Sequence, residues 1–154
     1  MKAASLTGHM FLGCFPLGET AIFLRIEKIM ILGIGTDVCE IARIEKACER
    51  KGFLERYFTA GENRLFEERN LRPQTIAANF AVKEAVAKAL GTGFCGFTLK
   101  DIETLRDDLG KPVVTLLGQA RERFLAMGGQ KIHVSISHSG KDAVAFVILE
   151  GESA

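Results

Sequence analysis

The chain has 154 residues, enough for one domain whose hydrophobic core needs no disulfide or metal to hold it together. Hydrophobic types make up 47% of the residues and charged types 25%, a composition that excludes a disordered chain and a coiled coil. The 20 basic and 19 acidic residues leave a net charge of +1. We therefore expect no nucleic-acid and no membrane partner, and an acidic or phosphorylated partner would need a local basic patch.

The cysteines and the apolar runs both indicate a cytoplasmic protein. The cysteines form no C-x-x-C pair and have no histidine at zinc-binding spacing, so we expect free thiols in a reducing compartment. No run reaches the ~18 apolar residues of a membrane span. The most apolar segment, residues 10–24, is interrupted by Pro16, Gly18 and Glu19, and it has no clear signal-peptide cleavage site.

Residues 1–29 differ from the rest of the chain in pattern. They show no sustained helical or alternating period, whereas a strand-like apolar run begins directly after Met30. We treat residues 1–29 as an extension of unassigned structure and residues 30–154 as the domain. Met10 and Met30 are both possible starts, so the extension could reflect an upstream start.

The first half of the domain is predicted to be mainly helical. A short strand at Ile31–Val38 precedes a helix at Glu40–Glu49 that gathers apolar residues on one face. Thr59 and Glu62 have the spacing of a capping box, in which each side chain satisfies a free backbone donor at the start of a short helix.

The second half is predicted to consist mostly of hairpins. Ile102–Arg106 and Val113–Leu117 flank a Leu-Gly-Lys-Pro turn, and Gln119–Met127 is helical. Ile132–Ser137 and Ala143–Leu149 flank a Ser-Gly-Lys-Asp turn. Early helices and late hairpins predict an α+β fold with a mostly antiparallel sheet packed against a long central helix.

That helix opens at Pro73, runs to Leu90 and is stopped by Gly91. It is apolar around most of its circumference and rich in alanine, so it should be packed on more than one side. Glu84 and Lys88 lie between its two apolar sectors. They are either an i,i+4 ion pair on a solvated stripe or a carboxylate and an ammonium at the wall of a cleft.

Two other polar residues of this helix, Asn79 and Lys83, are predicted to be ordinary surface positions. Asp37 ends the first strand in a Gly-Ile-Gly-Thr-Asp sequence whose glycines could let a ligand approach. A carboxylate there suits a magnesium site completed by phosphate oxygens, or it simply caps the following helix. Mg²⁺ typically takes one or two protein carboxylates, so the magnesium interpretation of Asp37 is supported only if Glu84 is the second ligand.

The chain also contains three weaker motifs. Residues 91–96 match G-x-G-x-x-G but follow a helix instead of a strand, so we interpret them as a helix terminator and a loop that can border a phosphate. Residues 133–139 alternate between polar and apolar types as a half-buried strand does, with His133 and Ser137 on one face and His138 on the other face or at the strand end. A serine nucleophile with a histidine base is conceivable here, but the sequence contains no G-x-S-x-G elbow. Arg43 and Arg50, with Arg56 farther along, form a basic stripe on or after the first helix.

Together these motifs resemble the holo-acyl-carrier-protein synthases, the short 4′-phosphopantetheinyl transferases. The matching pieces cover about residues 30 to 150 in the family's order, and each is weak alone. They are Met30–Val38 with Glu40 and Arg43, Phe80–Ala85 with Lys88 and Ala89, Gly91–Gly93, Gly110–Pro112 and His133–His138. The extension has no counterpart in the family pattern.

The resemblance implies transfer of the 4′-phosphopantetheine arm of coenzyme A to a serine of apo acyl carrier protein, with release of adenosine 3′,5′-bisphosphate. It implies that Asp37 and Glu84 hold Mg²⁺ against the pyrophosphate and that Lys88 neutralises phosphate charge, with Glu84 as the candidate base through a metal-bound water. The coenzyme would be lined by the residues Lys88, Gly91, Gly93, His133, Ser137 and His138. Arg43 and Arg50 would meet the acidic carrier protein.

The short family members resemble homotrimers with sites between subunits, and about 125 domain residues are too few for the two-lobed form of the family. Two alternatives remain open from the sequence. One is a non-catalytic regulator of the same fold that binds coenzyme A or a nucleotide. The other is an interaction domain in which Glu84 and Lys88 form only a surface ion pair.

Overall fold

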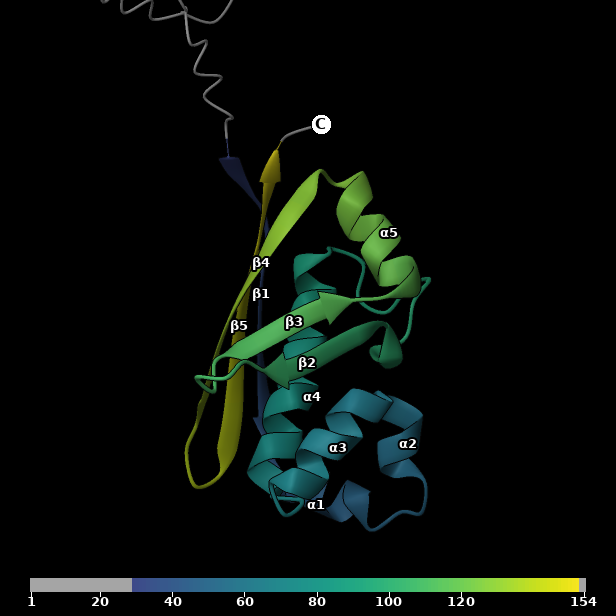
Figure 1. The fold of residues 1–154 in the computed structure, drawn as a ribbon, viewed down its shortest axis with the longest axis vertical. Helices are drawn as coiled ribbons and strands as arrows, with labels where there is room; N and C mark the ends of the chain where they lie inside the picture. The colour runs from purple at the N-terminus through teal and green to yellow at the C-terminus, as the bar shows by residue number, and fades with distance from the viewer. Residues whose placement is uncertain (1–28, 153–154) are drawn as a thin grey trace, which may run out of the picture.

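The computed structural model describes residues 29–152, which form two antiparallel sheets and five α-helices within this range (Figure 1). The predicted extension lies outside the described residues except for Ile29, which begins the first strand. In chain order the elements are β1 (Ile29–Glu40), α1 (Ile41–Cys48), α2 (Phe53–Tyr57), α3 (Ala60–Glu68), α4 (Pro73–Ala89), a short 3₁₀ helix (Leu99–Asp101), β2 (Ile102–Arg106), β3 (Pro112–Leu116), α5 (Gly118–Ala126), β4 (Gly129–His138) and β5 (Asp142–Glu152).

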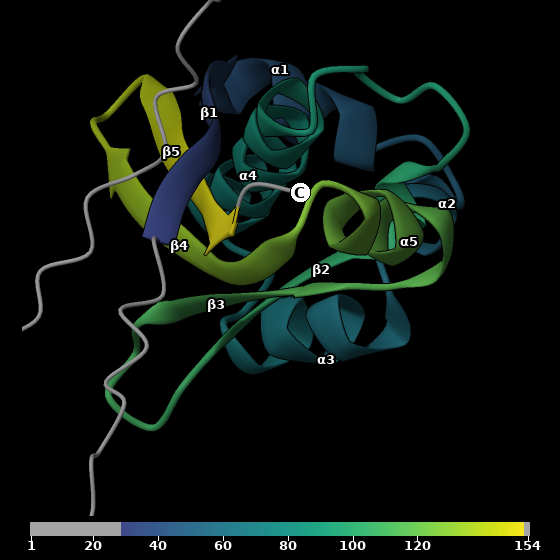
Figure 2. The ribbon, with the colours of Figure 1, turned by 90° about the horizontal axis from the view of Figure 1, so that it is seen from above.

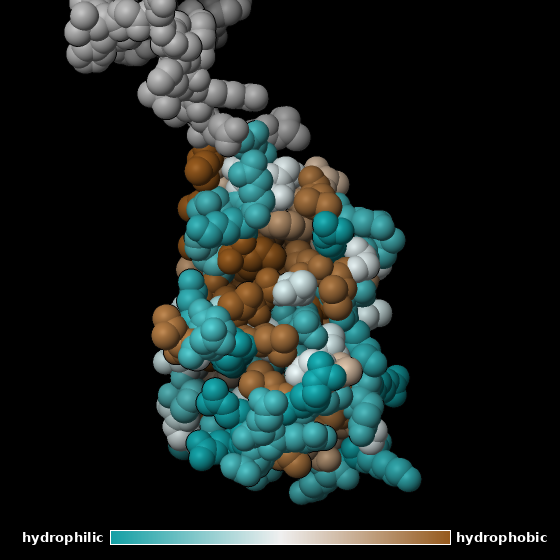
Figure 3. Space-filling view, in the orientation of Figure 1, coloured by the Kyte–Doolittle hydropathy of each residue, from teal (hydrophilic) through white to brown (hydrophobic). Residues whose placement is uncertain are grey.

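The larger sheet has the strand order β1-β5-β4, and β2 pairs with β3 in a separate hairpin. Helix α4 packs against one face of the larger sheet, and the hairpin lies beside β4 and α4, with α3 packed on β2 (Figures 1 and 2). This arrangement confirms the predicted α+β class with antiparallel sheets around a long central helix. The space-filling view shows hydrophobic side chains gathered over the middle and upper part of one face, whereas the end formed by α1–α3 is mostly hydrophilic (Figure 3).

The observed strands are longer than their apolar patterns. β1 and β5 pair from Ile29 opposite Glu152 to Glu40 opposite Asp142, well beyond the predicted Ile31–Val38 run. The reason is that backbone hydrogen bonds to a partner strand continue regardless of which side chains the strand carries. Helix α2 was not predicted, because five residues are too few for a periodic pattern.

Helix α4 lies unusually close to β1. A Cβ atom on Gly35 would lie 1.9 Å from the carbonyl oxygen of Ala85, and one on Gly33 would lie 2.1 Å from that of Ala89. The interpretation that these glycines admit a ligand is therefore wrong, because the backbone of α4 fills that space. Gly91 ends α4 as predicted, with φ at 77° and its amide donating to the Lys88 carbonyl.

The prediction that Asn79 and Lys83 are surface positions is wrong, since both have no exposed surface. The Lys83 ammonium lies 2.7 Å from the carboxylate of Glu62, which is also fully buried and forms the predicted capping box with Thr59. The backbone carbonyls of Leu99 and Ile102 accept the other Lys83 hydrogen bonds. This buried ion pair, with every Lys83 donor satisfied, holds α3, α4 and the start of β2 together. The tertiary pairing explains why the core can accommodate a charged lysine.

We expect Gly35→Ala to destabilise the fold, because the added methyl group would meet backbone instead of a movable side chain. Overpacking of this kind typically costs about 1–3 kcal/mol. The measurement is urea unfolding of the variant beside Gly140→Ala, whose added methyl group would meet nothing within 4 Å. Equal unfolding free energies for the two variants would contradict the close approach of β1 and α4.

Candidate active site

Asp37 lies near the end of β1, on the face of the sheet that α4 covers. Its carboxylate Oδ1 lies 2.8 Å from the Lys88 ammonium, which also donates to the carbonyl of Thr36 at 2.9 Å. The Asp37 side chain is only 17% exposed, whereas that of Lys88 is 52% exposed. Lys88 therefore links α4 to β1 through Asp37 instead of pairing with a neighbour on a solvated stripe of its own helix.

Glu84 faces the same group from one turn earlier on α4. Burial raises the pKa of Glu84, and the nearby Asp37 carboxylate raises this pKa further, while Lys88 and Arg43 lower it. Each of these charges must lie close enough to Glu84 to act on its titration. The structure thus brings together the three residues predicted to act in catalysis, with Arg43 at their edge.

The buried Cys39 lies on the same strand as Asp37, two residues farther along. Burial, reinforced by Asp37, raises the pKa of the Cys39 thiol to about 11. The thiol therefore stays protonated at neutral pH and is a poor nucleophile.

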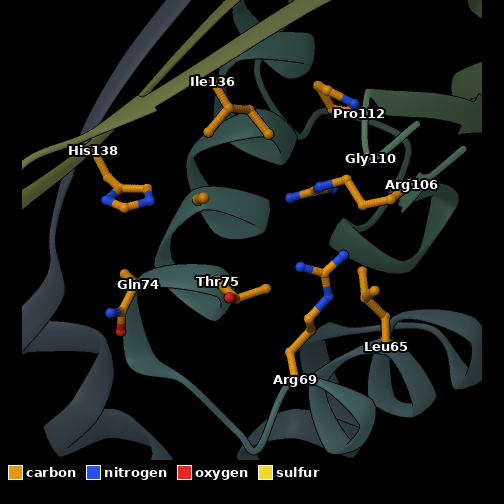
Figure 4. A pocket seen from close by; sticks show the side chains of 10 residues that line it. Leu65, Arg69, Gln74, Thr75, Arg106, Gly110, Pro112, Ile136 and His138 are labelled. Carbon is orange, nitrogen blue, oxygen red and sulfur yellow. The ribbon is translucent and has the colours of Figure 1, made fainter. Parts of the chain in front are cut away.

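A second group of basic side chains surrounds a cavity of about 250 Å³ between β4, α3, α4 and the β2–β3 turn (Figure 4). The guanidinium groups of Arg69 and Arg106 lie near each other on one side of it, and the ring of His138 lies on the opposite side (Figure 4). Burial lowers the pKa of Arg106, and the positive charge of Arg69 lowers it further. Arginine nevertheless stays charged in proteins, so the cavity has a concentrated positive charge suited to an anion.

The residues predicted to line the coenzyme do not all lie in the same place within this chain. His138 and Ile136 reach the basic cavity, whereas strand alternation puts His133 and Ser137 on the opposite face of β4. His133 Nε2 lies 3.0 Å from the Glu150 carboxylate there. Gly91 and Gly93 lie in the exposed loop after α4, both with positive φ, and the loop follows a helix as expected.

The basic cavity and the group formed by Asp37, Glu84 and Lys88 lie at different edges of the larger sheet. Asp37 belongs to β1 and His138 to β4, and β5 separates these strands. None of Asp37, Glu84 and Lys88 lines the cavity. The chain therefore holds the predicted catalytic residues in one place and a separate basic cavity that includes the predicted residue His138.

The sequence interpretation did not identify Arg69 and Arg106. Arg106 ends β2 just before the turn and Arg69 caps α3, positions where an arginine is ordinarily solvated. The burial of Asn79, which contacts Arg106, could have been predicted from the sequence. A helix that is apolar on nearly every side has little room for exposed polar residues, so its polar residues are candidates for burial. Arg43 and Arg50 are both exposed, on α1 and just after it.

Comparisons with known proteins give the class. Residues 33–147 match the model of the 4′-phosphopantetheinyl transferase superfamily. A holo-[acyl-carrier-protein] synthase of Clostridium novyi (strain NT) is 52% identical over 122 residues, which cover 79% of this chain and 88% of that protein.

Solved structures agree with this class. The crystal structure of a holo-ACP-synthase from Plasmodium yoelii superposes with a TM-score of 0.72 at 32% identity, over 82% of this chain and 100% of that chain. A holo-(acyl-carrier-protein) synthase from Bacillus anthracis in complex with CoA (3′,5′-ADP) superposes with a TM-score of 0.67 at 37% identity, over 80% and 99% of the two chains.

The chain therefore belongs to the 4′-phosphopantetheinyl transferase superfamily and, within it, to the enzyme family of the holo-[acyl-carrier-protein] synthases. This confirms the resemblance found in the sequence. In the part of the chain from residue 29 to residue 152, no helix is long and apolar enough to cross a membrane.

We expect Glu84→Gln to raise the free energy of unfolding at neutral pH in metal-free buffer. Because the carboxyl pKa is raised in the folded state, this state binds more protons than the unfolded one between the ordinary value of 4.5 and the raised value. Stability contributed by Glu84 therefore falls as pH rises through that window, and neutral Gln avoids the loss.

The measurement is urea unfolding at a series of pH values in the presence of a chelator. The gain over wild type should disappear below pH 4.5, where Glu84 is protonated in both states. Glu45→Gln on the exposed surface of α1 is the matched control. A Glu84→Gln protein that is no more stable than wild type at neutral pH would contradict the electrostatic description of the site.

Proposed function

We propose that the protein transfers the 4′-phosphopantetheine group of coenzyme A to a serine of apo acyl carrier protein and releases adenosine 3′,5′-bisphosphate. The observation that carries the proposal is the meeting of Asp37, Glu84 and Lys88 where β1 runs beside α4. Family membership supports the reaction class, and the B. anthracis relative in complex with CoA (3′,5′-ADP) supports the coenzyme.

The pair Asp37 and Glu84 fits a magnesium ion. Their oxygens are the hard ligands that Mg²⁺ prefers, and a cation would relieve the repulsion from Asp37 that adds to burial in raising the pKa of Glu84. Within residues 29–152 no three His, Cys, Asp or Glu side chains form a potential metal cluster. Two carboxylates would thus leave the remaining positions to phosphate oxygens and water, and the bound ion would neutralise charge on the pyrophosphate.

The other roles follow from charge. In the transfer, the serine oxygen forms a bond to the β-phosphorus as the bond from that phosphorus to the bridging oxygen breaks, and negative charge grows on the departing bisphosphate. The Lys88 ammonium, already held beside Asp37, is placed to stabilise that charge without reorganising. Glu84 is retained as the candidate base for the serine proton, acting through a water that the metal would hold.

The basic cavity supplies a second anion site. Coenzyme A has a pyrophosphate and a separate 3′-phosphate on the ribose. If Asp37, Glu84 and Lys88 engage the pyrophosphate, the group left for the cavity of Arg69, Arg106 and His138 is the 3′-phosphate. Gly91 and Gly93 offer exposed backbone next to Lys88, and we retain them with His133 and Ser137 as coenzyme contacts.

We propose a homotrimer with sites between subunits. The two site groups lie on strands that β5 separates, so a cavity of one copy could face the carboxylates of the next. The outer face of the sheet also exposes apolar side chains that a neighbouring copy would cover. These side chains are Ile31, Ile34, Val38 and Phe146, with exposures of 59%, 56%, 64% and 43%. A cytoplasmic location remains a prediction, in keeping with the free thiols of Cys39, Cys48 and Cys95.

The test of catalysis is incubation with apo carrier protein, coenzyme A and Mg²⁺, followed by intact mass. Glu84→Gln should lower kcat by about 10²–10³-fold, the loss expected on removing one main stabiliser of transition-state charge. The apparent Mg²⁺ requirement should also rise. Wild-type binding of coenzyme A without any mass gain on the carrier would favour the non-catalytic regulator, and unchanged turnover of Glu84→Gln at limiting Mg²⁺ would reject the metal role.

The test of shared sites is mixing of two inactive variants, Lys88→Ala and Arg69→Glu, by co-refolding. If each site combines Lys88 of one subunit with Arg69 of the next, random trimers at equal ratio should regain about one quarter of wild-type activity. Each variant refolded alone is the control. No regain in verified mixed assemblies would show that both residues act within one chain.

The test of the carrier surface is charge reversal of Arg43 and Arg50. If they meet an acidic carrier, each reversal should raise the carrier KM without weakening coenzyme A binding, more strongly at low salt because exposed charges are screened over about 8–10 Å at physiological ionic strength. Arg43→Glu should in addition lower kcat, since Arg43 lies near Glu84. An unchanged carrier KM for both variants at low salt would exclude this surface.

A further inference from the structure

Asn79 is a polar residue in the middle of α4 with no exposed surface. Its Nδ2 group donates to the carbonyl of Thr104 at 2.7 Å and to Glu62 Oε1 at 3.3 Å. Its Oδ1 atom accepts a hydrogen bond from Nη2 of Arg106 at 3.0 Å. A side chain so completely engaged in the core is more than filler, because it connects the buried ion pair to the basic cavity.

The network allows only one orientation of the Asn79 amide. Glu62 Oε1 also accepts from the Thr104 amide, and Glu62 Oε2 accepts from Lys83 and from the Thr59 amide. Rotating the amide by 180° would aim its oxygen at two acceptors and its nitrogen at a cation, and Glu62 Oε1 would lose one of its two donors. The oxygen of Asn79 is therefore fixed toward Arg106.

Arg106 is held on two sides. Its Nη1 group donates to the carbonyl of Leu105 at 3.0 Å, and its Nη2 group donates to Asn79. The guanidinium extends into the cavity beside that of Arg69, and His138 lies on the opposite side (Figure 4). Among residues 29–152, neither Arg69 nor Arg106 has a carboxylate within ion-pairing distance, so repulsion between the two cations is resisted by these hydrogen bonds.

We infer that Asn79 is a positioning residue for the coenzyme: it fixes Arg106 in the cavity and so sets the preference for a coenzyme that has a 3′-phosphate. This inference rests on the proposed function, which assigns the 3′-phosphate to the cavity. A guanidinium already held by hydrogen bonds at Nη1 and Nη2 loses less side-chain freedom when its remaining N–H groups bind a phosphate. Without Asn79, Arg106 is free to turn away from Arg69.

The experiment compares coenzyme A with 3′-dephospho-coenzyme A. We measure kcat and KM for both, and the dissociation constants by calorimetry, for wild type and for Asn79→Ala, Asn79→Ser, Arg106→Ala and the Asn79→Ala/Arg106→Ala double variant. Each single variant should lose about tenfold or more of the preference for the 3′-phosphorylated coenzyme, the scale of a hydrogen bond to a charged group. The loss should appear in KM with kcat nearly unchanged, and the double variant should lose no more than Arg106→Ala alone.

Thr104→Val is the matched control. Its hydroxyl is buried in the same network but has no hydrogen-bond partner among the described residues, and its backbone bonds to Asn79 and Glu62 remain. The preference should stay at the wild-type level in this variant. A purely structural role for Asn79 would instead lower stability and affect both coenzymes equally.

If both Asn79 variants fail to fold, Arg106→Lys and Arg69→Lys decide the question. An ammonium cannot bond Asn79 and the Leu105 carbonyl while presenting a fork, so Arg106→Lys should lose the preference as fully as Arg106→Ala. Arg69→Lys should keep most of it. Retained preference in Arg106→Lys, or in a folded Asn79→Ser protein, would overturn the inference. The binding constants report the preference even if the wild type shows no turnover, so the proposed function can fail separately.

Discussion

The contact between the backbones of β1 and α4 is the constraint on which the site depends. Gly33 and Gly35 bring the strand so close that a single Cβ atom would collide with the carbonyls of Ala85 and Ala89. A side chain at either glycine would push α4 outward and move Glu84 and Lys88 away from Asp37. The distance of 2.8 Å between Asp37 and Lys88 is thus a consequence of two missing side chains.

The buried ion pair of Lys83 and Glu62 does more than hold α3, α4 and β2 together, because its hydrogen-bond network also reaches the basic cavity. Burying charge is costly, and it is tolerated here because backbone carbonyls, backbone amides and Asn79 satisfy both groups. The same network continues through Asn79 to Arg106, so the rigid interior of the protein reaches the wall of the basic cavity. Scaffold and binding surface are one hydrogen-bonded unit on that side of α4.

The separation of charges matches the chemistry we propose. Carboxylates and Lys88 gather beside β1, where a metal-assisted phosphoryl transfer needs both signs of charge, and arginines gather beside β4, where a phosphate needs only to be held. A coenzyme with two phosphate groups at different places along its length suits such a division. The exposed apolar outer face of the sheet gives a physical reason for copies of the chain to join these halves.

Apart from α2, the sequence alone determined the order of the main elements, the α+β class, the capping box at Thr59 and the candidate residues Asp37, Glu84 and Lys88, because local periodicity and short motifs depend on near neighbours. The tertiary structure alone decided that Lys83 and Asn79 are buried, that Gly33 and Gly35 serve a helix, and that Arg106 faces a cavity. Each of these depends on partners between 16 and 56 residues away, and no periodic pattern records which distant group will satisfy a buried charge or fill a missing side chain.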